Sequence, residues 1–204
     1  MEFSNKAHWE TIYTTKTPEQ VSWTQEKPAI SLELIEAVNL PKSAKIIDIG
    51  GGDSLLVDFL LEAGYSEITV LDISQAALDR AKKRLGSKAA LVTWICSDIL
   101  DFKPTEMYQL WHDRAAFHFL TQPKSIATYT ELTEKHAVNL IIGTFSESGP
   151  LKCSGLEIKQ YSEKLMEISF EKAFTKIECV FSDHVTPFDA TQHFIFCRFQ
   201  RNAY

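Results

Sequence analysis

The sequence predicts an α/β fold built on a mostly parallel β-sheet that an antiparallel hairpin closes near the C-terminus. Two observations lead to this prediction. Short apolar runs alternate with segments of helical spacing along most of the chain, which is the pattern of strands joined by crossover helices. The last two apolar runs are separated only by a turn-rich segment around Pro187 and Asp189. That segment is too short for a crossover helix, so these two runs should pair antiparallel.

The expected elements run from residue 45 to residue 199 and describe a seven-stranded sheet with helices on both faces. Strands are predicted at residues 45–49, 67–72, 89–95, 108–112, 137–145, 175–181 and 192–199. Helices are predicted at residues 54–63, 75–85 and 124–135. Two more helical patterns, at residues 6–14 and 28–38, precede the first strand. We expect one domain over residues 1–204, in which residues 1–40 form a helical cover and residues 45–204 the sheet core.

Composition narrows the classes of function. The chain has 204 residues, of which 45% are hydrophobic, and this is enough for one well-filled core. Its formal net charge of -6 argues against a broad nucleic-acid interface, which needs a basic surface. No apolar run approaches the roughly 20 residues of a membrane span. The mixed polar residues 1–10 predict neither a signal peptide nor an anchor.

Four cysteines lie far apart in the sequence, without the paired spacing of zinc or redox sites. They are Cys96, Cys153, Cys179 and Cys197. We expect reduced thiols in a cytoplasmic protein and no metal site.

Three glycines follow the first predicted strand directly and precede a helix. In Asp48-Ile49-Gly50-Gly51-Gly52 the backbone turns sharply, and the missing Cβ atoms let a ligand approach it. Two more carboxylates follow the next two strands, Asp72 at the end of residues 67–72 and Asp98 after residues 89–95. The carboxyl ends of parallel strands share one edge of a sheet, which is the usual ligand crevice of such folds. An ordinary glycine-rich turn would not need these carboxylates.

A dinucleotide-binding fold is the nearest alternative. Its Gly-x-Gly-x-x-Gly pattern needs a third glycine where this chain has Leu55. In addition, Asp48 stands immediately before the turn, where it would repel a pyrophosphate. S-adenosylmethionine fits better, because it offers an ammonium group, a ribose and an adenine amine without any phosphate.

These motifs resemble those of class I, Rossmann-like, S-adenosylmethionine-dependent methyltransferases, and the resemblance covers essentially the whole chain. Ser54 departs from the third glycine of many members. The resemblance implies that S-adenosylmethionine is the cofactor. It also implies that a Trp-x-x-x-Tyr helix at the N-terminus closes over the cofactor. The implied cofactor-binding residues are Trp9, Tyr13, Asp48, Gly50, Gly51, Gly52, Asp72, Ile73, Asp98 and Ile99.

The residues that would touch the methyl acceptor are expected at the end of the fourth strand. His112 and Asp113 are candidate bases, whereas Arg114 and His118 are candidates for binding the acceptor, with Arg114 suited to an acidic one. In the alternative interpretation, Asp113 caps the next turn and pairs with Arg114. The Asn/Asp-Pro-Pro-Tyr/Phe motif of methyltransferases that act on base amino groups is absent here, which argues against a nucleic-acid acceptor. The long loop over residues 146–155 is a further candidate for acceptor binding.

We therefore expect a methyltransferase that acts on a small molecule. Two alternatives remain open. The segment from Trp9 to Trp23 also resembles the opening of some protein-lysine methyltransferases, so the acceptor is alternatively a protein side chain. A binding module that senses the cofactor without turnover is the second alternative.

Overall fold

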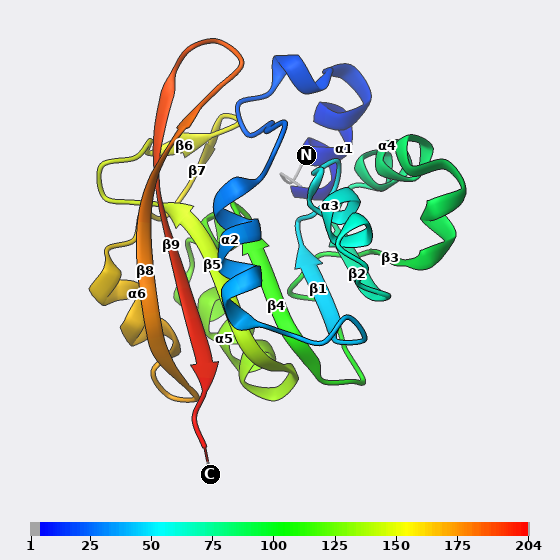
Figure 1. Ribbon diagram of the computed structural model, residues 1–204. Coiled ribbons are helices and arrows are strands. Elements are labelled where there is room, and N and C mark those ends of the chain that lie inside the picture. Colours follow the sequence, from blue (N-terminus) through cyan, green and yellow to red (C-terminus); the bar gives the residue numbers. More distant parts are fainter. Residues whose placement is uncertain (1–4, 204) are drawn as a thin grey trace.

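The computed structural model describes residues 5–203, which form a seven-stranded sheet with helices on both faces (Figure 1). The strand order is β3-β2-β1-β4-β5-β9-β8. The first five pair parallel, and β9 pairs antiparallel with both β5 and β8. This confirms the predicted sheet and its terminal hairpin. The strands are β1 (Lys45–Ile49), β2 (Glu67–Asp72), β3 (Val92–Cys96), β4 (Tyr108–Arg114), β5 (Ala137–Phe145), β8 (Phe174–Val185) and β9 (Thr191–Arg201).

Two apolar layers lie on opposite faces of the sheet, because successive side chains of a strand point to opposite sides. In β1, Ile46 belongs to the layer under α2, α3 and α4, whereas Ile47 belongs to the layer under α5 and α6. Both isoleucines are fully buried. The helices are α1 (Asn5–Thr15), α2 (Ala29–Val38), α3 (Leu56–Glu62), α4 (Gln75–Leu85), α5 (Pro123–His136) and α6 (Glu163–Phe170).

The element boundaries depart from prediction in a few places. Residues 89–91 end a 3-10 helix (Gly86–Leu91) instead of starting β3, and β4 continues to Arg114. The sequence reading missed α6, which Ser162 caps by accepting a hydrogen bond from the backbone N–H of Leu165. It also missed a small hairpin of β6 (Lys152–Cys153) and β7 (Leu156–Glu157). The two strands of this hairpin are too short to show a period.

The expectation of four reduced thiols is wrong for one pair. Cys179 of β8 and Cys197 of β9 lie directly opposite each other in the antiparallel register and form a disulfide. Cys96 and Cys153 are free thiols. Pairing depends on the register of the hairpin, which sequence spacing alone did not reveal.

The strand order reverses next to β1, because the chain adds β2 and β3 on one side and β4 and β5 on the other. A crevice opens at the carboxyl edge of a sheet at such a point. The helix α1 lies over this edge, whereas α2 packs on the face of the sheet through Leu34 and Ile35 (Figure 1). Among residues 5–203, no helix has the length and apolar character that crossing a membrane requires.

Candidate cofactor and acceptor site

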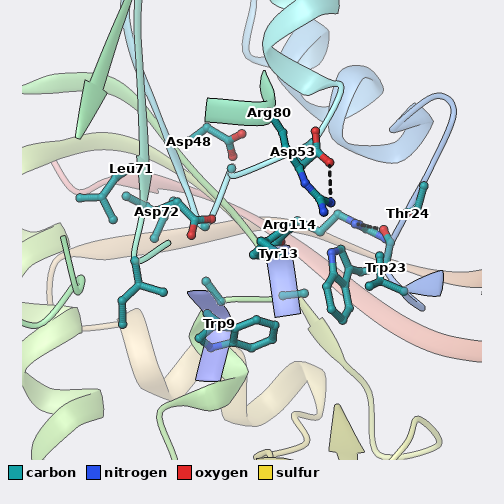
Figure 2. A pocket seen from close by; sticks show the side chains of 18 of the residues that line it. Trp9, Tyr13, Trp23, Thr24, Asp48, Asp53, Leu71, Asp72, Arg80 and Arg114 are labelled. Atoms are coloured by element: carbon teal, nitrogen blue, oxygen red, sulfur yellow. Dashed lines mark hydrogen bonds and ion pairs between the residues drawn. The ribbon is translucent and has the colours of Figure 1, made fainter. Parts of the chain in front are cut away.

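A cavity of about 760 Å³ occupies the crevice at the carboxyl ends of β1, β2 and β4. Figure 2 shows aromatic rings of the N-terminal segment facing the carboxylates of the strand ends across it. Most of the predicted site residues line this cavity, and Gly52, Asp113 and His118 do not. The predicted residues that line it are Trp9, Tyr13, Asp48, Gly50, Gly51, Asp72, Ile73, Asp98, Ile99, His112 and Arg114.

The glycine loop after β1 leaves no room for side chains. A Cβ atom on Gly51 would lie 2.5 Å from Oδ2 of Asp48, and one on Gly52 would lie 2.5 Å from Oδ2 of Asp72. Gly52 also has a φ of 35°, which L-residues rarely adopt. Gly52 therefore acts from behind the cavity wall, where it lets the carboxylate of Asp72 pack against the loop.

Asp72 ends β2 and is 4% exposed, so its carboxylate is nearly shielded from water. Its Oδ1 accepts a hydrogen bond of 2.8 Å from the backbone N–H of Ser74. Burial, together with the nearby charges of Asp48 and Glu10, raises the pKa of Asp72 to about 7. A ligand that donates hydrogen bonds here would stabilise the ionised form of this carboxylate.

The helix α1 is fastened to the start of α4, next to Asp72. The carboxylate of Glu10 accepts hydrogen bonds from the hydroxyl of Ser74 at 2.8 Å and from the backbone N–H of Ala76 at 3.2 Å. An anion is favoured at this position, because the first N–H groups of a helix have no partners within the helix. The contact holds the N-terminal segment over the cavity.

Four aromatic rings pack together where this segment covers the cavity. The ring centroid of Trp9 lies 5.5 Å from that of Trp23 and 5.1 Å from that of Phe119. The ring of Tyr13 lies 6.1 Å from Trp23. All four rings line the cavity, so the expectation that the N-terminal aromatics lie over the site agrees with this packing.

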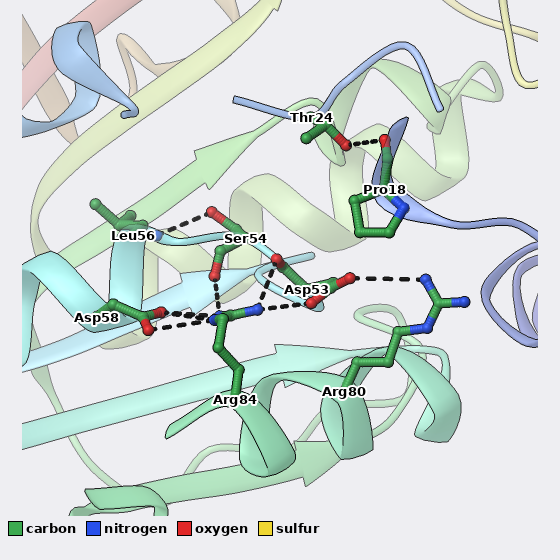
Figure 3. A network of polar contacts seen from close by, with 8 residues as sticks. All are labelled: Pro18, Thr24, Asp53, Ser54, Leu56, Asp58, Arg80 and Arg84. Carbon is green, nitrogen blue, oxygen red and sulfur yellow. Dashed lines mark hydrogen bonds and ion pairs between the residues drawn. The ribbon is translucent and has the colours of Figure 1, made fainter. Parts of the chain in front are cut away.

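Two arginines of α4 hold the loop that follows the glycines (Figure 3). Arg84 pairs with Asp53 at 2.6 Å and with Asp58 at 2.8 Å, and it donates to the carbonyl of Ser54 at 2.8 Å. Arg80 pairs with Asp53 at 3.7 Å. The sequence reading missed this network, because the two arginines, one helical turn apart, look like ordinary surface charges on an amphipathic helix.

At the end of β4, His112 is buried and both of its ring nitrogens have partners. Its Nδ1 lies 2.7 Å from Oδ1 of Asp48, and its Nε2 lies 2.9 Å from Oγ of Ser31. A carboxylate only accepts hydrogen bonds, so Nδ1 carries a proton that it donates to Asp48, and the hydroxyl of Ser31 can donate to Nε2. His112 thereby holds Asp48 in place and has no free nitrogen for a substrate proton. Ser31 carried no motif in the sequence that would have revealed this contact.

Asp113 lies on the other face of β4, outside the cavity wall. Its carboxylate accepts hydrogen bonds from the hydroxyl of Tyr129 at 2.7 Å and from the backbone N–H groups of Ala116 at 3.0 Å and Phe117 at 3.1 Å. Burial raises the pKa of Asp113 to about 6. This geometry argues against the expected role as a base and matches the alternative in which Asp113 caps the next turn.

His118 also lies away from the cavity, in the apolar core. Its side chain is fully buried, and burial lowers its pKa to about 3, with the charge of Arg114 adding to the effect. A neutral imidazole is thus enclosed by protein, where its Nδ1 accepts a long hydrogen bond of 3.4 Å from the backbone N–H of Phe145. The expected contact between His118 and an acceptor is not supported by this position.

Arg114 is the residue of this strand end that reaches the cavity with an available charge. Its Nη1 donates to the backbone carbonyl of Trp23 at 3.0 Å, and it does not pair with Asp113. From the loop at residues 146–155, Cys153 also lines the cavity. Among residues 5–203, no three His, Cys, Asp or Glu side chains gather as metal ligands do.

Comparison with known proteins relates this chain to methyltransferases. Residues 46–135 match the family model described as a methyltransferase domain. Malonyl-[acyl-carrier protein] O-methyltransferase of Anoxybacillus flavithermus is 34% identical over 103 residues, which are 50% of this chain and 39% of that protein. The eEF1A lysine and N-terminal methyltransferase of Mus musculus is 26% identical over 116 residues, which are 55% of this chain and 16% of that protein. The chain therefore spans less than half the length of these curated relatives.

Among solved structures, the N-methyltransferase NodS of Bradyrhizobium japonicum in complex with S-adenosyl-L-homocysteine has the same fold, with a TM-score of 0.73. The two chains are 17% identical, and the match covers 98% of this chain and 100% of that one. The predicted arrangement of strands and helices is thus the class I, Rossmann-like methyltransferase fold.

Proposed function

We propose, from the class I methyltransferase domain that this chain contains, that it is an enzyme that transfers a methyl group from S-adenosylmethionine to a small-molecule acceptor. One observation carries the proposal. The cavity at the reversal of strand order brings together the glycine loop and three carboxylates, Asp48, Asp72 and Asp98, at the carboxyl ends of three neighbouring strands.

The residues present fit this cofactor. Asp72 is a nearly buried carboxylate that two ribose hydroxyls would satisfy, and the missing Cβ atoms of Gly51 and Gly52 let the glycine loop pack against Asp48 and Asp72. Asp98 has one oxygen bonded to the backbone N–H of Leu100 at 2.9 Å, so its other oxygen suits the adenine amine. Asp48, held by His112, suits the ammonium group. When bound, S-adenosylmethionine supplies a methyl group on a positively charged sulfur, which is an excellent leaving group.

The chain itself contributes binding, orientation and the exclusion of water. His112 fixes the carboxylate of Asp48, and Glu10 fastens the aromatic cover next to Asp72. Such a cover stabilises the bound state by removing ligand surface from water. We propose no base among the residues of the β4 end, because both nitrogens of His112 are engaged and Asp113 and His118 lie outside the cavity.

A small-molecule acceptor is favoured over a protein side chain. The aromatic rings of the N-terminal segment line a cavity of about 760 Å³, a size that suits a compact ligand. The relative with higher identity is named for O-methylating malonyl-[acyl-carrier protein], a small acyl group on a carrier protein, and the more distant one is named for methylating lysine and the N-terminus of eEF1A. The protein acceptor remains the second candidate, on the strength of the latter likeness.

Transfer of a labelled methyl group tests the proposal directly. The protein is incubated with S-adenosylmethionine carrying a tritiated methyl group, together with either fractionated metabolites or a peptide library. We expect label in a metabolite fraction and release of S-adenosylhomocysteine. Label only in peptides would favour the protein acceptor, and cofactor binding without any turnover would favour the sensing module.

A further inference from the structure

Arg114 is held in an unusual setting for a cation. Among residues 5–203, its Nε and Nη2 atoms have no hydrogen-bond partner and are shielded from solvent, while Nη1 donates to the carbonyl of Trp23 (Figure 2). The guanidinium carbon lies 5.3 Å from the ring centroid of Phe194, so an aromatic face covers part of the group. Arg114 thus lines the cavity, and two of its three nitrogens have no protein partner.

The guanidinium is charged at neutral pH. Burial lowers the pKa of Arg114 only to about 10. Within the described part of the chain, no carboxylate lies at ion-pair distance from Arg114, whereas Arg84 and Arg198 are paired with carboxylates. Burying a charge without a counter-ion is unfavourable, because the group loses its hydration and gains no partner in return. A ligand anion would supply the missing partner.

The contacts of Arg114 place it on the acceptor side of the site. The cofactor cradle is built from the ends of β1, β2 and β3. Arg114 instead packs against Phe194 of β9 and borders a small recess lined by Ser182 and His184 of β8. These strands lie on the opposite side of β4 from the cradle.

A carboxylate fits the electrostatics better than a phosphate. The same cavity is lined by Asp48, Asp72 and Asp98, whose charges repel a dianion more strongly than a monoanion. A carboxylate also matches the planar fork of a guanidinium. We propose that Arg114 binds a carboxylate of the methyl acceptor, so that the enzyme selects small carboxylic acids. This inference rests on the proposed function and names its substrate class.

The test uses the full-length protein loaded with S-adenosylhomocysteine and measures ligand binding by saturation-transfer NMR. The probes are short monocarboxylates and dicarboxylates, each paired with its uncharged amide, together with methyl phosphate. We expect carboxylates to bind in preference to their amides and to methyl phosphate. In Arg114→Gln the preference for carboxylates should fall at least about tenfold, since a buried charge-assisted pair is lost. Arg114→Lys should restore part of it.

Calorimetry separates the possible failures. Arg198→Gln, which removes a paired arginine of β9, is the matched control. It should change neither the binding of carboxylates nor that of S-adenosylhomocysteine. The affinity for S-adenosylhomocysteine should stay within about threefold in Arg114→Gln, because the proposal places no cofactor contact on this residue. A large loss for S-adenosylhomocysteine, with normal binding of 5′-methylthioadenosine, would show that Arg114 holds the carboxylate of the cofactor and overturn the inference.

Two more results would also overturn the inference. One is equal binding of carboxylates and amides, and the other is a preference for methyl phosphate. If Arg114→Gln does not fold, the comparison of carboxylates with amides in the wild type and in Arg114→Lys decides the question. A wild-type protein that does not bind S-adenosylhomocysteine would instead refute the proposed function itself.

Discussion

Asp72 and Asp113 lie near the ends of the two strands that flank β1, and both are buried carboxylates. Burial raises the pKa of Asp72 to about 7 and that of Asp113 to about 6. Asp72 lines the cavity, whereas Asp113 is enclosed by a tyrosine hydroxyl and two backbone N–H groups on the far side of β4. Burial and a raised pKa are therefore common to a candidate binding group and a structural one. What distinguishes them is whether the carboxylate faces the cavity.

Strand alternation explains the difference. In the register of β1 and β4, Asp48 lies beside His112 and Ile49 beside Asp113. His112 and Arg114 therefore share the cavity side of the strand, and Asp113 points to the opposite face. Three adjacent polar residues looked like one catalytic cluster in the sequence, but they belong to two faces of the sheet.

The largest expected effect is the loss of stability in Asp113→Ala. Removing the carboxylate leaves Tyr129 and two backbone N–H groups without an acceptor, and we expect about 2–4 kcal/mol less free energy of unfolding. Urea denaturation measures this change, and Asp101→Ala, at an exposed position, serves as the control. A fully stable Asp113→Ala protein that binds cofactor but does not turn over would restore Asp113 as a catalytic candidate.

The second effect concerns the cover that lies beside Asp72. Deleting residues 1–22 should leave the sheet core folded but weaken binding of S-adenosylhomocysteine at least about tenfold, because the aromatic cover and its contact at α4 are lost. In Glu10→Ala, which removes the hydrogen bonds to Ser74 and Ala76, we expect a loss of about three- to tenfold. Calorimetry measures both, with Glu33→Ala on the exposed side of α2 as the control. Unchanged affinity in the truncated protein would show that α1 does not cover the bound ligand.

A smaller effect is the pH dependence of binding. Ribose hydroxyls donate to the ionised form of Asp72, so the affinity for S-adenosylhomocysteine should rise as the pH increases from about 6 to about 8, through the raised pKa. The rise should be absent in Asp72→Asn. The same affinity curve in both proteins would contradict the assignment of Asp72 to the ribose.

Without ligand, Asp72 and Asp113 should make the protein less stable as the pH rises, whereas the affinity for ligand increases with pH. Both have an ordinary pKa of 3.8 and a higher one in the folded protein, so the folded state binds more protons between these values. The free energy of unfolding should therefore fall as the pH rises from about 4 to about 7. Saturating S-adenosylhomocysteine should remove the contribution of Asp72 and leave that of Asp113. Guanidinium denaturation across this pH range, with and without ligand, separates the contribution of Asp72 to stability from that of Asp113.

Local signals explain how much of this molecule the sequence predicted. The strands β1, β2 and β5 and the helix α4 were predicted at their observed residues, because apolar runs and helical spacing within each segment are enough to identify it. The glycine loop and Asp72 could be found for the same reason. The partners that complete the site come from distant segments. Ser31 reaches His112 from α2, and Arg84 reaches Asp53, just after the glycine loop, from α4. Such contacts depend on tertiary packing and leave no local pattern.

The disulfide shows a similar limit with a different cause. Cys179 and Cys197 oppose each other because the hairpin turns near Phe188, and a register shifted by one residue would have placed them on opposite faces. The sequence located both strands, but the position of the turn was left open between Pro187 and Asp189. Register, more than strand assignment, limited the prediction here.

The central claim is that the cavity beside Asp72 binds S-adenosylmethionine. Isothermal titration calorimetry tests this claim most directly. The wild-type protein is titrated with S-adenosylhomocysteine and, separately, with NAD, and the Asp72→Asn protein is titrated with S-adenosylhomocysteine. We predict binding of S-adenosylhomocysteine and none of NAD. The Asp72→Asn protein should bind about 10–100-fold more weakly, because two hydroxyls lose a charged acceptor, and Asp79→Asn on the exposed side of α4 should bind normally. Binding of NAD without S-adenosylhomocysteine, or full affinity in folded Asp72→Asn, would contradict the account.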